Sequence, residues 1–254
     1  MVNKDNKLDT AHFYIGTSGW TYDHWKGLFY PQDLPRSKWF DFYARHFNAV
    51  EVNATFYRRF KDQTYHKWRE RAPTGFRYVL KTPRFITHRK LLLHVEDNIH
   101  EFCQSANLLG EHLGMILLQV APRMPFDLER VRNALMAFED PGRVAVEFRA
   151  KQWYCEQIQQ LLHEVGAAFC SADSPKTELV EWVTSRRAYI RLHGRKCWYS
   201  YNYSDAELLE IAKLAFRMTQ QGAEEVYIFF NNDFEGYAPK NALQLQSIIK
   251  SNFR

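Results

Sequence analysis

Short apolar runs alternate with amphipathic stretches along most of the chain. The apolar runs are rich in Val, Ile, Tyr and Phe, which is typical of buried strands. They occupy residues 13–16, 49–52, 78–80, 115–118, 144–146, 168–170, 189–192 and 226–230. The amphipathic stretches carry apolar residues at helical spacing, and they occupy residues 37–47, 128–138, 155–165, 204–218 and 241–250. Ser204 with Glu207 three residues later predicts a capping box at the start of one of these helices.

Strands that alternate with helices predict βαβ units and a parallel sheet. Eight strands in 254 residues match a TIM-type (β/α)8 barrel, which typically takes about 250 residues. We therefore expect an α/β fold with one barrel domain at residues 13–254, after a polar tail at residues 1–12. The alternative is an open doubly wound sheet, which favours a glycine-rich loop after its first strand. The first strand leads into GTSGW and not into GxGxxG, so this alternative is disfavoured.

In this barrel the active site lies at the carboxyl ends of the strands. Several predicted strands end there in charged or amide residues, and side chains alternate along a strand with period two. The pairs that share a face are Glu51 with Asn53, Glu147 with Arg149, and Arg191 with His193. The apolar residues between them, which are Val52, Phe148 and Leu192, are expected to point toward the helices. Because burying so many polar groups would be costly, their clustering favours a polar pocket.

The candidate catalytic residues are Glu51, Lys81, Glu147 and His193, whose side chains transfer protons in many enzymes. The candidate substrate-binding residues are Trp20, Asn53, Tyr57, His88, Arg149, Arg191, Asn231 and Asp233. Several of these residues could instead have purely structural roles. Glu51 and Lys81 on neighbouring strands could neutralise each other, and Glu147 could pair with Arg149 or Arg191. Trp20 and Tyr57 could be rim packing, and Asp233 could cap the following loop.

A divalent metal held by carboxylates and an imidazole is a further alternative. The candidate ligands are Glu51, Glu147, Asp173, His193 and Asp233. No HxH or HExxH spacing supports them, so a metal is not favoured and the cofactor stays unknown. The four cysteines lie far apart without a CxxC pair, which favours neither a zinc site nor a disulfide framework.

The charge is mildly basic, with a formal net charge of +5. Eleven Lys and Arg residues gather between Arg58 and Lys90, where only Asp62 and Glu70 oppose them. This stretch is either a solvated face or a rim that attracts phosphate. The polar N-terminus is unlike a secretory signal, and no apolar run is long enough to span a bilayer. We expect a cytoplasmic protein with no membrane partner, and the sequence gives no oligomeric state.

Several ordered motifs resemble those of the YecE-like family, a family of domains of unknown function (DUF 72). They are YIGTSGWTYDHWKGLFYP, VEVNATFYR, KTPRFITH, VAVEFR, YIRLHG and FFNNDFEGYAPKNA, and the resemblance runs from about Phe13 to Ile249. The chain departs from the family's pattern at Phe60 and Ala121, where prolines are common. The resemblance implies a TIM-type barrel and supplies no established reaction.

Three functions follow from these features. The leading hypothesis is an enzyme that uses acid/base chemistry on a small anionic substrate, such as a phosphorylated or carboxylated metabolite, with hydrolase, isomerase and lyase classes all open. The second is a protein that binds or processes nucleic acid, which the basic stretch and its aromatic residues motivate. The third is a metabolite-binding protein without catalysis.

Overall fold

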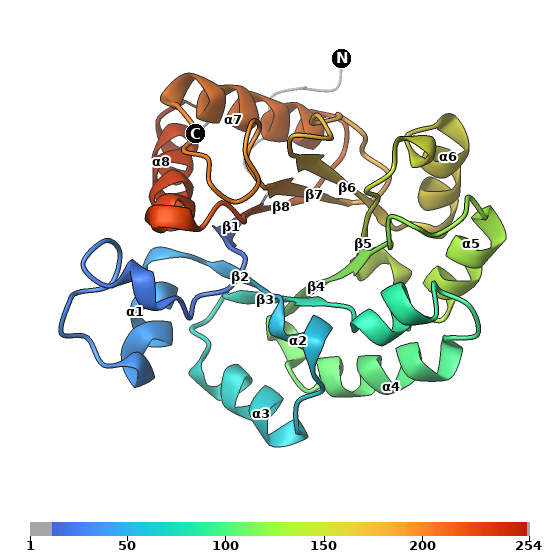
Figure 1. Ribbon diagram of the computed structural model, residues 1–254, viewed down its shortest axis with the longest axis horizontal. Coiled ribbons are helices and arrows are strands. Elements are labelled where there is room, and N and C mark those ends of the chain that lie inside the picture. The colour runs from blue at the N-terminus through green and yellow to red at the C-terminus, as the bar shows by residue number, and fades with distance from the viewer. Residues whose placement is uncertain (1–11, 253–254) are drawn as a thin grey trace, which may run out of the picture.

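The protein is a TIM-type (β/α)8 barrel, with eight parallel strands at the centre and helices around them (Figure 1). The computed structural model describes residues 12–252, so most of the predicted polar tail lies outside it, while His12 already belongs to the first strand. The strands are β1 (His12–Thr17), β2 (Ala49–Val52), β3 (Arg77–Lys81), β4 (Leu113–Gln119), β5 (Val144–Glu147), β6 (Ala168–Asp173), β7 (Arg187–Leu192) and β8 (Glu225–Phe230). Each apolar run identified in the sequence is confirmed as a strand.

Eight α-helices accompany these strands within the described residues. They are α1 (Trp39–His46), α2 (Ala54–Tyr57), α3 (Asp62–Arg71), α4 (Glu96–Asn107), α5 (Leu128–Met136), α6 (Glu156–Val165), α7 (Asp205–Gln220) and α8 (Tyr237–Asn252). The five helices predicted from spacing are confirmed, and so is the capping box of Ser204 and Glu207 at the start of α7. Helices α2, α3 and α4 were not predicted from the sequence. In residues 12–252 no helix is both long and apolar enough to cross a membrane.

Two apolar layers follow from the alternation of side chains along the strands. The outer layer lies between the strands and the helices and includes Val52, Phe148 and Leu192, which confirms the predicted direction of these three. The inner layer fills the barrel and includes residues such as Met115 and Tyr227. The polar strand-end residues follow the inward-pointing apolar residues at a spacing of two, so their side chains also point into the barrel. They gather above the inner layer at the carboxyl ends of the strands.

The barrel closes between β1 and β2 without a regular backbone ladder, because these two strands are the ends of the sheet order. We call this junction the β1–β2 seam. A single bridge joins Ser18 to Glu51 there. The Asn48 side chain replaces other ladder bonds, since its Oδ1 accepts the Ile15 N–H at 2.9 Å and its Nδ2 donates to the Phe13 carbonyl at 2.8 Å.

Tyr43 of α1 also spans the seam. Its hydroxyl accepts the Thr17 N–H at 2.8 Å and donates to the Ala49 carbonyl at 3.0 Å. The two strands come close at Gly16, where an added Cβ would lie only 2.0 Å from the Ala49 oxygen. This distance explains why the seam has glycine at position 16, and it shows that side-chain bonds and close contact hold β1 against β2.

Candidate active site

Glu51 lies near the carboxyl end of β2, with its side chain on the inward face, and it is fully buried. Its carboxylate accepts hydrogen bonds from Ser18 Oγ at 2.7 Å, Tyr189 Oη at 2.6 Å and Arg191 Nη2 at 2.6 Å. Burial alone would raise the pKa of Glu51, but the Arg191 charge and these three donors outweigh it and lower the pKa below its usual value. Glu51 is therefore a paired carboxylate at neutral pH.

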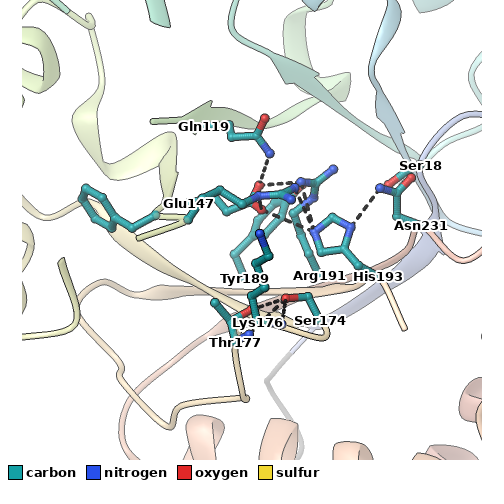
Figure 2. Close-up of polar contacts among 12 residues, drawn as sticks. Ser18, Gln119, Glu147, Ser174, Lys176, Thr177, Tyr189, Arg191, His193 and Asn231 are labelled. Atoms are coloured by element: carbon teal, nitrogen blue, oxygen red, sulfur yellow. Dashed lines mark hydrogen bonds and ion pairs between the residues drawn. The ribbon is translucent and has the colours of Figure 1, made fainter. Parts of the chain in front are cut away.

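Glu147 ends β5 and is equally buried. Its Oε2 accepts from Gln119 Nε2 at 2.7 Å and from Arg191 Nη1, and its Oε1 lies 2.6 Å from Arg149 Nε. Burial would raise its pKa, but Arg191, Arg149 and His193 together hold the pKa well below the usual range. Arg191 thus joins the acids of β2 and β5 across the barrel, and Figure 2 shows its guanidinium beside Glu147.

His193 follows β7 and is buried beside this pair. Its Nδ1 lies 2.9 Å from the Asn231 amide nitrogen and its Nε2 lies 3.3 Å from Glu147 Oε1 (Figure 2). Because the amide donates to Nδ1, the ring hydrogen belongs on Nε2, where it can point to Glu147, while Arg149 Nη2 and Arg191 Nη1 also lie 3.3 and 3.5 Å from Nε2. Burial and then the nearby Arg191 charge lower the pKa of His193 to about 4. The imidazole is therefore neutral at pH 7.

Lys81 is the last residue of β3 and is 8% exposed. Its Nζ lies 4.2 Å from the centre of the Phe56 ring and makes neither a hydrogen bond nor an ion pair with a residue of the described range. The alternative that Lys81 neutralises Glu51 is wrong, since Glu51 pairs with Arg191. Burial and then Arg191 lower the pKa of Lys81 to about 8, against the opposing effect of Glu147.

Two other predicted residues lie near this group. His88 is half-buried with its ring 5.0 Å from that of Phe56, and burial followed by the Lys81 charge lowers its pKa to about 4. The Asn53 side-chain oxygen is buried and has no hydrogen-bond partner in the part of the chain that the structure describes. An unpaired buried oxygen of this kind is costly, which is consistent with a contact to a bound molecule.

Three predicted binding residues are not brought into the cluster. Trp20 packs at 5.6 Å on Phe40 at the side of the barrel, and Tyr57 is 70% exposed. Asp233 Oδ2 lies 3.6 Å from His24 Nε2. The sequence placed these three at the mouth because they follow strand ends, but none of these contacts involves Glu147. For Trp20, the rim-packing alternative describes the observed contact.

Four residues of the site were not among the predicted ones. Ser18, Gln119 and Tyr189 bind the two carboxylates, and each lies on the inward phase of a strand or directly after one. The alternation of side chains along β4 alone could have identified Gln119, which lies beside Glu147 in the register of β4 and β5. Trp198 lies in the loop after β7, with the Arg149 guanidinium 5.0 Å from its ring, and no sequence pattern indicated it.

An open groove of about 900 Å³ lies at the ends of β5, β6 and β7. Its walls include Asp173, Lys176 and Arg195, and Figure 2 shows the Lys176 side chain extending toward the Arg191 cluster. Arg195 Nε binds Asp173 Oδ2 at 2.9 Å, while burial raises the pKa of Asp173. Within residues 12–252, the residues that line this groove do not include Glu51, Lys81, Glu147, Arg191 or His193. The groove is linked to them through the His193 N–H, which donates to the Asp173 carbonyl at 2.9 Å.

The donor set does not form a metal site. Within residues 12–252 no three His, Cys, Asp or Glu side chains are grouped so that they could hold an ion. Of the candidate ligands, Glu51 and Glu147 bind Arg191, and Asp173 binds Arg195. These three carboxylates are thus engaged in ion pairs with arginines.

A family model described as protein of unknown function DUF72 matches residues 14–254. The chain belongs to this family. The predicted resemblance is thereby confirmed, since relatives of this DUF72 protein include the UPF0759 protein YunF of Bacillus subtilis (strain 168). YunF is 25% identical over 269 residues, which cover 93% of this chain and 94% of YunF. The UPF0759 protein YecE of Escherichia coli (strain K12) is 28% identical over 194 residues, covering 71% of this chain and 69% of YecE.

A crystal structure of a DUF72 family protein from Thermotoga maritima MSB8 has the same fold. Its TM-score is 0.85 at 28% identity, and the match covers 94% of this chain and 99% of the other. None of these names states a reaction. The chemistry of this DUF72 protein must therefore be argued from its own residues.

Proposed function

We propose that this DUF72 protein is an enzyme that binds a small anionic substrate at the barrel mouth and exchanges a proton through Lys81. The observation that carries the proposal is the unpaired Lys81 amine beside the balanced ion pairs. Glu51 and Glu147 offset the charges of Arg149 and Arg191, so a protonated Lys81 is surplus positive charge. A buried cation without a partner favours an anionic ligand such as a phosphate or carboxylate group.

The same amine suits proton transfer. A catalytic acid or base works best when its pKa is near the operating pH, and the pKa of Lys81 is lowered to about 8. The predicted catalytic carboxylates suit this less, because their lowered pKa values and full sets of donors make them poor bases. We assign Glu51 and Glu147 the role of positioning Arg191, and we assign neutral His193 the role of a hydrogen-bond donor. Hydrolysis, isomerisation and lyase chemistry are all compatible with this set.

Direct titration of Lys81 tests the binding step. NMR of protein labelled at lysine should give one ammonium with a midpoint near pH 8, and Lys81→Arg should remove that signal. Inorganic phosphate should raise the midpoint by about one pH unit or more, because a nearby anion favours the charged amine. Lys176→Met serves as the control that leaves the signal in place. A midpoint near the ordinary 10.4, unmoved by phosphate, would contradict the proposal.

Catalysis itself is tested by product formation. The protein is incubated with a mixture of sugar phosphates and short hydroxy and keto acids, and the mixture is followed by mass spectrometry. We expect a substrate to be converted by the native chain and not by Lys81→Met. Tight capture of a compound that returns unchanged would instead support the metabolite-binding hypothesis.

Nucleic-acid binding has less support from the contacts. The aromatic residues in or beside the basic stretch are Tyr57, Phe60, Tyr65 and Trp68. Tyr57 is 70% exposed, but Tyr65 is only 2% exposed and Trp68 packs on Tyr78 at 5.9 Å, so these last two rings are turned into the protein. Gel retardation of single-stranded DNA or RNA that weakens steeply with salt would restore this hypothesis.

A further inference from the structure

A second cavity, of about 280 Å³, lies outside the barrel mouth. It is bordered by α2, by α4 and by the π-helix η4 (Phe85–Arg89). Its floor is apolar and includes Phe56, Tyr65, Ile86 and Phe102, each at most 8% exposed. We call this cavity the η4 groove. It is small for a ligand site, where about 300–1,000 Å³ is usual for drug-sized molecules, and it has room for one ring or a short acyl chain.

The rim of the η4 groove is strongly basic. It carries Arg58, Arg59, Arg84 and Arg89, and the acidic side chain Glu101 pairs with Arg59. The side chains of Arg84 and Arg89 make no ion pair or hydrogen bond with another residue in the described range. Two free guanidiniums therefore stand at the opening of an apolar pocket.

The backbone that presents these arginines is unusual. η4 is a π-helix, a rare element that often occurs at functional sites. It is followed by Leu91 and Leu92 with φ of 51° and 63°, in the left-handed region that branched, bulky residues rarely adopt. Such strain persists only where the surrounding structure imposes it, and it concentrates at ligand sites and switches. The strained residues follow directly after the π-helix that carries Arg89.

We propose that the η4 groove binds a small amphiphilic anion, composed of one ring or short acyl chain that carries a carboxylate. The apolar part would lie on Ile86 and Phe102, and the carboxylate would meet the forked donors of Arg84 and Arg89. The site is distinct from the mouth, although both share Phe56, whose ring contacts the Lys81 amine. A nucleic-acid chain fits less well, because the closed floor admits a single ring and offers no row of stacking surfaces.

Binding of 4-(trifluoromethyl)benzoate, followed by ¹⁹F NMR, tests the proposal. The native chain should bind it, and Arg84→Ala/Arg89→Ala should weaken the affinity about tenfold or more, because two charge-assisted hydrogen bonds are lost. The neutral 4-(trifluoromethyl)benzamide should bind weakly and equally to both proteins. Lys213→Ala/Lys250→Ala removes the same charge from the exposed faces of α7 and α8 and should leave benzoate binding unchanged.

Two further variants locate the ligand. Asn98 is half-buried on α4 and lines the groove, so Asn98→Trp should fill it and abolish binding. Lys81→Met should bind benzoate as the native chain does. If Lys81→Met abolishes binding, or if benzoate and benzamide bind alike, the proposal is overturned. Displacement of benzoate by an equimolar oligo(dT) 15-mer would show that the occupant is a nucleic acid and would overturn it as well.

Discussion

At the scale of single residues, Arg191 decides the character of the site. Its two terminal nitrogens bind carboxylates from opposite sides of the barrel, and all three side chains are at most 1% exposed. Buried ion pairs contribute little net stability compared with apolar packing, but removing one partner leaves an uncompensated charge in the interior. The charge of Arg191 is therefore needed to keep Glu51 and Glu147 ionised inside the barrel.

Arg191→Met is expected to lower the free energy of unfolding by about 3–5 kcal/mol, because two buried carboxylates lose their common partner. Urea unfolding at pH 7 measures this. Arg186→Met is the matched control, since Arg186 belongs to a surface pair with Glu224 and is 78% exposed. Its loss should be far smaller, because exposed ion pairs contribute little to stability. A similar decrease in the free energy of unfolding for the two variants would mean that Arg191 does not stabilise the two buried carboxylates.

At the scale of elements, the β1–β2 seam sets the shape of the mouth. Glu51 and Ser18 meet across it, so the position of the β2 acid depends on how the barrel closes. The bonds that close it come largely from the side chains of Tyr43 and Asn48, and not from a continuous ladder. Single substitutions at Tyr43 or Asn48 therefore remove several of the bonds that hold the seam.

Tyr43→Phe isolates this dependence, because it removes one hydroxyl and keeps the ring. It leaves the buried Thr17 N–H and Ala49 carbonyl without a partner, and we expect a loss of about 1–3 kcal/mol in urea unfolding. Tyr57→Phe removes a hydroxyl from a ring that is 70% exposed, and it should have almost no effect. An unchanged midpoint for Tyr43→Phe would show that the backbone alone closes the barrel.

At the scale of the whole molecule, stability should fall on acidification from about pH 6.5. The pKa of His193 is about 4 in the fold, whereas an unperturbed histidine has about 6.5, so the unfolded chain binds the proton first. Stability is full above pH 6.5 and falls by about 1.4 kcal/mol per pH unit for this group down to pH 4. Glu51 and Glu147, whose pKa values are lowered, add a further loss when they protonate below pH 4.5.

Urea unfolding between pH 7 and pH 4.5 measures this slope. His193→Gln should make the slope shallower by the share of this imidazole, while His88, whose pKa is also lowered to about 4, keeps contributing. His163→Gln, at an exposed position on α6, should keep the native slope. A native protein whose stability is constant over this range would contradict the buried neutral imidazole.

The fold was predictable because parallel barrel strands are buried on both faces and appear as apolar runs. The spacing of Ile99, Phe102, Cys103 and Ala106 could also have predicted α4, whereas α3 buries only Tyr65 and has no apolar stripe. The inward direction of the strand-end residues followed from period two.

Their pairing did not follow from the sequence. Glu51 binds Arg191, which is 140 positions away, and not the neighbouring Lys81, because the barrel interior joins strands that are not adjacent. Loop residues were least predictable. Trp198 reaches Arg149, and Asp233 turns to His24, through chain segments without periodicity.

The side-chain closure of the barrel has a consequence for its behaviour in concentrated solution. If Asn48 and Tyr43 release, β1 and β2 become the free edges of an open eight-stranded sheet. Free edges present unpaired N–H and carbonyl groups that can template pairing with another chain. Opening of this one junction would convert the closed barrel into a species that can aggregate edge to edge, so the same few hydrogen bonds that shape the mouth also protect the protein from this aggregation.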